Sequence, residues 1–135
     1  MQNRLSSFHN YVHVCLIIIV IIITVISHGS QAFIYITRQV DDEKVRILVS
    51  RILDHPVLAE LDLSHNVVGD HGARALGKLL VTGRCRLTRL ALADNAIRAA
   101  GAQALAHALT RNSTLQSLNL RLNRLGDDGG QAICK

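Results

Sequence analysis

The sequence predicts an α/β solenoid of short parallel strands and outer helices, and three observations support this fold class. The stretches LAELDLSHN (58–66), LTRLALADN (87–95) and LQSLNLRLN (115–123) share leucine at their first, fourth and sixth positions and asparagine at their ninth. The asparagines are spaced by 29 and then 28 residues, a period typical of units that bury their core against their neighbours. Each stretch is followed by a segment whose apolar residues recur at helical spacing.

Each repeat is predicted to begin with a strand and to continue into a helix. Residues 61–64 alternate leucine with polar residues, which places the leucines on one face of a strand. Residues 67–80 and 96–109 have the apolar spacing of a helix, and residues 124–135 begin the same pattern. Asp70 stands where an N-cap would satisfy the first free backbone N–H groups of its own helix.

The repeated leucines and asparagines are expected to build the solenoid and to carry no chemistry. Each buried leucine contributes roughly 1.5–3 kcal/mol by leaving water. A buried asparagine amide can donate and accept towards the backbone of its own and the adjacent coil, and losing it would leave groups unsatisfied at roughly 1–3 kcal/mol each. These structural positions are Leu58, Leu61, Leu63, Asn66, Leu87, Leu90, Leu92, Asn95, Leu115, Leu118, Leu120 and Asn123.

A degenerate repeat is predicted before the first full one. Residues 40–52 align with 68–80 when the sequence is shifted by 28 positions, and FIYIT (33–37) then falls where a strand is expected. We therefore predict a repeat domain over residues 33–135, about three and a half units long and incomplete at its C-terminal end. Residues 1–32 are predicted to form a separate apolar segment.

This apolar segment contains VHVCLIIIVIIITVI, from Val12 to Ile26, with no formally charged residue. We expect a helix here, although with Tyr11 included its 16 residues would span only about 24 Å of a hydrocarbon core roughly 30 Å thick. A secretory signal, a membrane anchor and the start of a soluble chain all remain open. The sequon Asn112-Ser113-Thr114 favours secretion, whereas Cys15, Cys85 and Cys134, scattered and odd in number, favour a reducing compartment. We expect an alternative or mis-joined beginning of a longer chain.

Composition and motifs argue against catalysis, metal binding and nucleic-acid binding. The net charge is +5, but the basic residues are scattered and no aromatic residues interleave with them. No Cys-x-x-Cys pair occurs, and His65 and His71 beside Asp70 have no third ligand at a suitable spacing. Nucleophile elbows and phosphate-binding glycine loops are also absent from the sequence. We expect no cofactor, no metal and no enzyme activity.

A solenoid offers a surface for a protein partner. Alternate strand side chains point to the concave face, and neighbouring parallel strands lie about 4.8 Å apart, so Glu60 should lie beside Arg89 with Ser117 next in line. The candidate partner surface comprises Glu60, Asp62, Arg89, Asn119 and Arg121. Binding could equally use the convex helices, with Arg74, Lys78, Arg98 and Gln103.

The pattern L-x-x-L-x-L-x-x-N, its period and the helix GDHGARALGKLL resemble the ribonuclease-inhibitor class of leucine-rich repeat, which implies a segment of an α/β horseshoe. Residues 38–134 are similar to leucine-rich-repeat subunits of the nexin–dynein regulatory complex of motile cilia. That resemblance implies a non-catalytic scaffold in the cytoskeleton of a cilium or flagellum, with other axonemal subunits as partners. The alternative is a secreted leucine-rich-repeat recognition module, or one tethered to a membrane through Val12 to Ile26.

Overall fold

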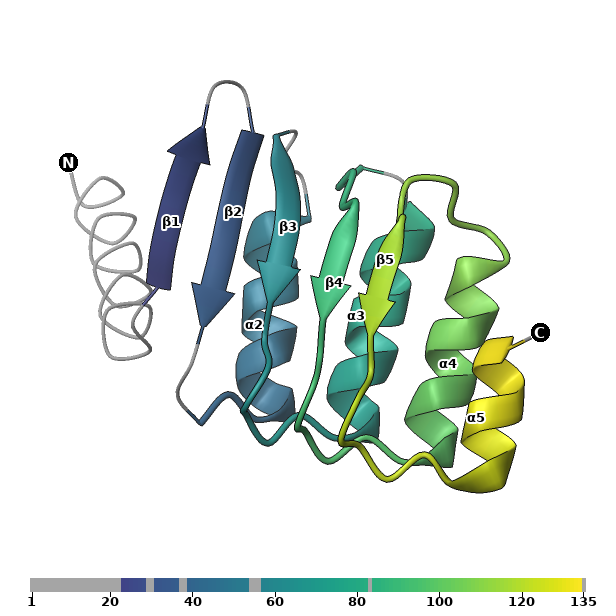
Figure 1. Cartoon of the computed structure of the whole chain (residues 1–135). Coiled ribbons are helices and arrows are strands. Elements are labelled where there is room, and N and C mark those ends of the chain that lie inside the picture. Colours follow the sequence, from purple (N-terminus) through teal and green to yellow (C-terminus); the bar gives the residue numbers. More distant parts are fainter. Residues whose placement is uncertain (1–22, 29–30, 37–38, 54–56, 83, 135) are drawn as a thin grey trace, which may run out of the picture.

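The computed structural model describes residues 23–28, 31–36, 39–53, 57–82 and 84–134, and it has the predicted α/β solenoid architecture (Figure 1). Five strands form one sheet in the order β1-β2-β3-β4-β5, and the helices lie together on one side of it. Strands β2 to β5 are parallel, as the repeat predicts. The elements are β1 (Ile23–His28), β2 (Gln31–Ile36), α2 (Asp42–Ile52), β3 (Leu58–Asp62), α3 (Asp70–Thr82), β4 (Arg89–Ala91), α4 (Ala99–Leu109), β5 (Ser117–Asn119) and α5 (Gly126–Cys134).

The core lies between the sheet and the helices and is built from aliphatic side chains. The strand leucines of the first two full repeats are at most 1% exposed, namely Leu58, Leu61, Leu63, Leu87, Leu90 and Leu92. Helix α3 contributes Leu76, Leu79 and Leu80 to the same cluster, and α4 contributes Leu105. Leu115, Leu118 and Leu120 are partly buried, because within the described residues a neighbouring repeat covers them on one side only.

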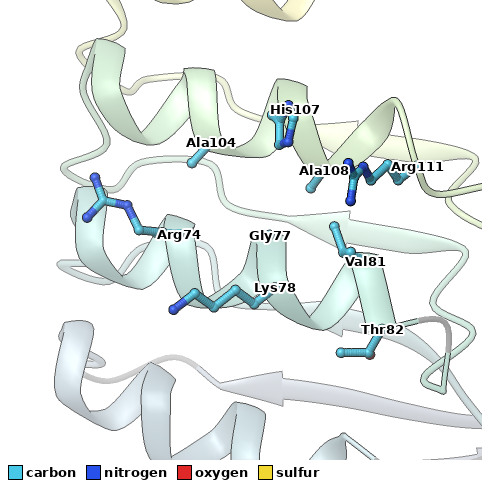
Figure 2. Close-up of a pocket in the computed structure, with 9 residues that line it drawn as sticks. All are labelled: Arg74, Gly77, Lys78, Val81, Thr82, Ala104, His107, Ala108 and Arg111. Atoms are coloured by element: carbon cyan, nitrogen blue, oxygen red, sulfur yellow. The ribbon is translucent and has the colours of Figure 1, made fainter.

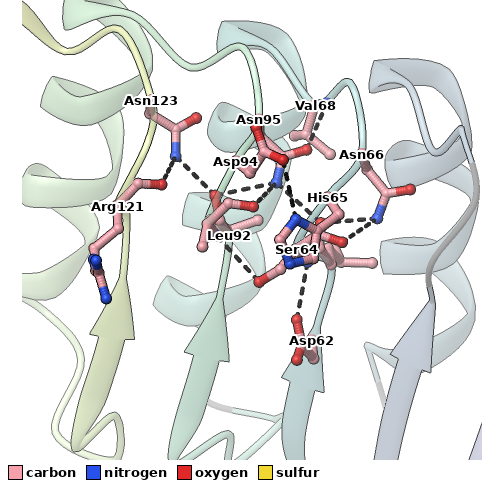
Figure 3. A network of polar contacts seen from close by, with 12 residues as sticks. Asp62, Ser64, His65, Asn66, Val68, Leu92, Asp94, Asn95, Arg121 and Asn123 are labelled. Carbon is pink, nitrogen blue, oxygen red and sulfur yellow. Dashed lines mark hydrogen bonds and ion pairs between the residues drawn. The ribbon is translucent and has the colours of Figure 1, made fainter.

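The repeated asparagines join each coil to the preceding one (Figure 3). The Asn95 Oδ1 atom accepts a hydrogen bond of 3.0 Å from the Val68 backbone N–H. Its Nδ2 group donates to the carbonyls of Leu63 at 3.0 Å and Leu92 at 3.1 Å. Asn66 and Asn123 make the same set of bonds one repeat earlier and later. Because Asn66 and Asn95 are each only 9% exposed, these amides replace water that the turning backbone cannot reach.

Aspartate side chains cap the helix of the following repeat, which corrects the expectation for Asp70. The Asp70 Oδ1 atom accepts from the backbone N–H groups of Arg98 at 2.7 Å and Gly101 at 3.0 Å, both at the start of α4. Asp42 likewise accepts from the Gly69 N–H at 2.6 Å, at the start of α3. Stacking brings each aspartate beside the next helix N-terminus. A Cβ on Gly101 would lie 2.7 Å from Asp70 Oδ1, so glycine makes room for this contact.

The apolar N-terminal segment is only partly described, and the described part is not helical. Ile23–Ile26 lie in β1, which pairs antiparallel with β2 from Ile23↔Ile36 to His28↔Gln31. This corrects the helix expected up to Ile26: β-branched residues favour strands, and the edge of β2 offers free backbone hydrogen-bonding groups. The remainder of the expected helix, Val12 to Ile22, lies outside the described residues. No helix in the described part of the chain has the length and apolar character needed to cross a membrane.

Candidate protein-interaction surface

The concave face of the sheet carries a row of polar side chains, and they line a shallow cavity of about 330 Å³. The register pairs Glu60 with Arg89 and Arg89 with Ser117, as the repeat spacing predicts. The next row pairs Asp62 with Ala91 and Ala91 with Asn119. The cavity is lined by Tyr35, Glu60, Leu61, Asp62, Ser64, Arg89, Leu90, Ala91, Ser117 and Asn119.

Glu60 is the centre of this row. Tyr35 donates a hydrogen bond of 3.3 Å through its hydroxyl to Glu60 Oε2, and the Arg89 guanidinium lies 3.5 Å from Glu60 Oε1. The Glu60 side chain is 23% exposed and that of Arg89 is 65% exposed. Such an open ion pair stabilises the fold by less than about 1 kcal/mol. The guanidinium therefore remains available to a partner at little cost to the fold.

Tyr35 is a residue that sequence reasoning missed. Its burial, followed by the negative charge of Glu60 and their hydrogen bond, raises the pKa of the Tyr35 phenol above its ordinary value. The repeat spacing gave no signal, because the 28-residue shift that aligns the helices would place Tyr35 opposite Leu63, in the core. The sheet instead pairs Tyr35 with Asp62, after a register shift at Ala32/Phe33. The alternation Ile34-Tyr35-Ile36 is the signal that could have shown that Tyr35 faces away from the core.

The other predicted surface residues lie at the ends of the strands. Asp62 Oδ1 accepts from the Ser64 backbone N–H at 2.9 Å, and Asn119 Oδ1 accepts from the Arg121 N–H at 3.1 Å. Both side chains thus turn back on their own chain and fix the bend that follows each strand. Arg121 is exposed beyond β5. The structure brings Glu60 and Arg89 into contact, whereas the side chains of Asp62 and Asn119 bond to local backbone and Arg121 is exposed.

His65 and Asp94 form a second exposed pair at the rim (Figure 3). Their Nδ1 and Oδ2 atoms are 3.0 Å apart, and their side chains are 69% and 56% exposed. Both residues have positive φ angles, 61° and 54°, at the position before the repeated asparagine. Among the described residues, no three His, Cys, Asp or Glu side chains are grouped so that they could hold a metal ion.

The sequon asparagine is part of the fold. Asn112 Nδ2, the atom to which a glycan would be attached, donates to the Leu80 carbonyl at 3.0 Å and to Thr114 Oγ1 at 3.2 Å. Asn112 Oδ1 accepts from the Leu115 backbone N–H at 2.8 Å. The side chain joins the α4–β5 turn to the C-terminal end of α3. Glycosylation would compete with these bonds, so the triplet has a structural explanation.

The fold and the repeated contacts define a leucine-rich-repeat protein. The leucine-rich repeat family model matches residues 55–77, 85–106 and 111–134, which together make up more than half of the chain. The chain therefore belongs to the leucine-rich repeat family.

Among individual proteins, the chain is similar to dynein regulatory complex subunit 5. It is 56% identical to the Macaca fascicularis protein over 91 residues, 67% of this chain and 18% of that protein. It is 56% identical to the Mus musculus protein over 51 residues, 38% of this chain and 10% of that protein. The pig (Sus scrofa) ribonuclease inhibitor is 40% identical over 78 residues, 58% of this chain and 17% of the inhibitor. The chain thus spans less than a fifth of these relatives, and the resemblance to subunits of the dynein regulatory complex is confirmed.

Proposed function

We propose that this chain is a non-catalytic protein-interaction scaffold of the dynein regulatory complex, acting in the axoneme of a cilium or flagellum and supporting motility. The observation that carries the proposal is the 56% identity to dynein regulatory complex subunit 5 over two thirds of this chain. The solenoid architecture supports it, because stacked repeats present an extended surface to a partner. The partners proposed are other subunits of the same complex.

The surface proposed for this role is the concave row centred on Glu60 and Arg89. Arg89 extends from the sheet with 65% of its side chain exposed, and its bond to Glu60 is long at 3.5 Å. A partner carboxylate could pair with Arg89, while Glu60 keeps its hydrogen bond from Tyr35. Asp62, Asn119 and Arg121 extend this surface along the strand ends. A mixed-charge patch of this kind selects a partner by electrostatic complementarity.

The location is tested with the intact chain, tagged at its C-terminus and expressed in a ciliated cell. Separate samples are extracted with detergent and with alkaline carbonate. Retention of the tag on detergent-washed axonemes is the expected result. Release by detergent combined with resistance to carbonate would instead identify a membrane-bound protein and refute the axonemal proposal. Secretion of the tagged chain into the medium would refute it equally.

The concave surface is tested in the same cells with Arg89→Glu. Charge reversal should spare the fold, because Arg89 is exposed, and it should reduce axonemal retention. Arg86→Glu is the matched control, since Arg86 is exposed in the return between α3 and β4 and changes the net charge equally. If both variants are retained like the parent, the concave row is not the partner surface. Circular dichroism of the purified variants verifies that both remain folded.

A further inference from the structure

The convex face has an apolar groove between α3 and α4 whose edges are positively charged (Figure 2). The groove has a volume of about 400 Å³, within the range of about 300–1,000 Å³ common for binding pockets. Val81, Ala104 and Ala108 point into the space between the two helices. Gly77 forms part of the floor, and a Cβ at this position would lie 3.3 Å from the Ala104 carbonyl oxygen. The two helices approach each other closely here, and the described residues on the floor of the groove have no polar side chains.

Basic side chains stand on both edges of this groove. Arg74 and Lys78 lie one helical turn apart on α3, and Arg111 lies in the turn that follows α4. His107 on α4 also lines the groove. All four residues are exposed. None of the described residues that line the groove is acidic. Within the described part of the chain, no carboxylate pairs with Arg74, Lys78 or Arg111.

The charge is specific to the grooves that flank α3. The neighbouring groove between α2 and α3 shares Arg74 and Lys78 and adds Arg46, again with no acidic residue among the described residues that line it. Among the described residues, no arginine, lysine, aspartate or glutamate lines the groove between α4 and α5, whose lining includes Gln103 and Ile133. Helix–helix grooves therefore recur along the solenoid, whereas among the described residues arginine and lysine line the two grooves that flank α3 and do not line the groove between α4 and α5.

We propose that the α3–α4 groove docks an acidic amphipathic helix of a protein partner. Apolar side chains of that helix would lie over Gly77 and Ala108, and glutamates or aspartates on its flanks would meet Arg74, Lys78 and Arg111. An amphipathic helix in an apolar groove is a recurring mode of peptide recognition. Charge complementarity favours an acidic partner. A nucleic acid fits less well, because none of the described residues that line the groove is an aromatic residue of the kind on which a base stacks, Phe, Tyr or Trp.

The inference rests on the proposed scaffold function, because it assumes a protein partner. It adds the chemistry of that partner. Its test is independent of the cell, because it uses the purified intact chain and a defined peptide. If the acidic peptide does not bind, the groove proposal fails and the axonemal proposal still stands on its own retention test. If the tagged chain is not retained on axonemes, the axonemal proposal fails and the measured peptide binding still stands.

The probe is a fluorescent helical peptide with leucines at i and i+4 and glutamates at the flanking positions, measured by fluorescence anisotropy. The same peptide with lysine in place of each glutamate is its control. The acidic peptide is expected to bind and the lysine peptide is not. Binding should weaken as salt is added, because the edge charges are exposed. Absence of binding by the acidic peptide, or equal binding of both peptides, would overturn the proposal.

Variants of the chain locate the contact. The double variant Lys78→Glu with Arg111→Glu should weaken binding of the acidic peptide about tenfold or more. Arg51→Glu with Arg86→Glu makes the same change in net charge at exposed positions outside the groove, and it should bind like the parent. Ala104→Met fills the floor without altering charge and should also weaken binding. If the two charge variants bound the acidic peptide with equal affinity, the groove would not be its docking site. Full displacement of the peptide by single-stranded polyuridylate would also refute the proposal.

Discussion

Replacing Asp70 with alanine is expected to lower the free energy of unfolding by about 2 kcal/mol, although Asp70 is not part of the leucine core. Its Oδ1 atom accepts two backbone N–H groups of the next repeat, from Arg98 at 2.7 Å and from Gly101 at 3.0 Å. The N-cap residue of α4, Arg98, provides no side-chain hydrogen bond of its own. Loss of an N-cap acceptor costs about 0.5–2 kcal/mol, and a carboxylate with two donors lies at the upper end of that range.

Asp127 provides a matched control for this substitution. It occupies the position of Asp70 in the last repeat and is acidic in the first turn of α5. Within the described residues its side chain makes no hydrogen bond to a following helix. Asp127→Ala should therefore lose only the interaction with the dipole of its own helix, about 0.5 kcal/mol. The difference between the two alanine variants isolates the cap between repeats.

The assay is urea unfolding followed by far-ultraviolet circular dichroism, with a thermal melt as a second measurement. A loss of 2 kcal/mol corresponds to a decrease in Tm of about 8–16 °C for a domain near this size. Asp70→Asn, which keeps an oxygen acceptor without the charge, should fall between parent and alanine variant. Faster hydrogen exchange of the Arg98 and Gly101 amides would locate the effect. An Asp70→Ala variant within about 0.5 kcal/mol of the parent, or equal to Asp127→Ala, would refute the reasoning.

Three further predictions concern single side chains. Leu122 has a φ of 58° and is 71% exposed, so Leu122→Gly should stabilise the chain by about 1 kcal/mol in urea unfolding, whereas Leu122→Ala should not. Burial and the charge of Glu60 raise the pKa of Tyr35 above 10.0, so the neutral phenol contributes stability that is present below that pH and is lost as pH rises through the raised pKa. Glu60→Gln should lower the pKa of Tyr35, and an unchanged ultraviolet titration of the phenolate would contradict this. Burial also raises the pKa of the Cys85 thiol, so this thiol should react with a thiol-specific aromatic disulfide only after unfolding. The delayed reaction should disappear in Cys85→Ala; a reaction of Cys85 in the folded chain would contradict the burial.

The sequence by itself determined the repeat and, in the full repeats, the side of each strand and helix that faces the core. Leucine at alternate strand positions and apolar residues at helical spacing are local patterns. They identify the buried side of a strand or helix without information from the rest of the chain. The 28–29-residue period then determined which residues of neighbouring strands lie side by side, such as Glu60 and Arg89. For this reason the parallel sheet and its outer helices could be predicted without any knowledge of the three-dimensional structure.

Only the tertiary structure decided several contacts that cross from one repeat or strand to the next. A slip of one residue moves a side chain to the other face of a sheet, so the register shift at Ala32/Phe33 places Tyr35 on the concave face. Stacking of the repeats places the Asp70 carboxylate beside the backbone N–H donors of α4, and it bonds to these in place of the donors of its own helix. Ile23–Ile26 form a strand because they pair with the edge of β2. For Asp70 and for Ile23–Ile26, the partner belongs to a neighbouring repeat or strand, and a local sequence pattern cannot identify it.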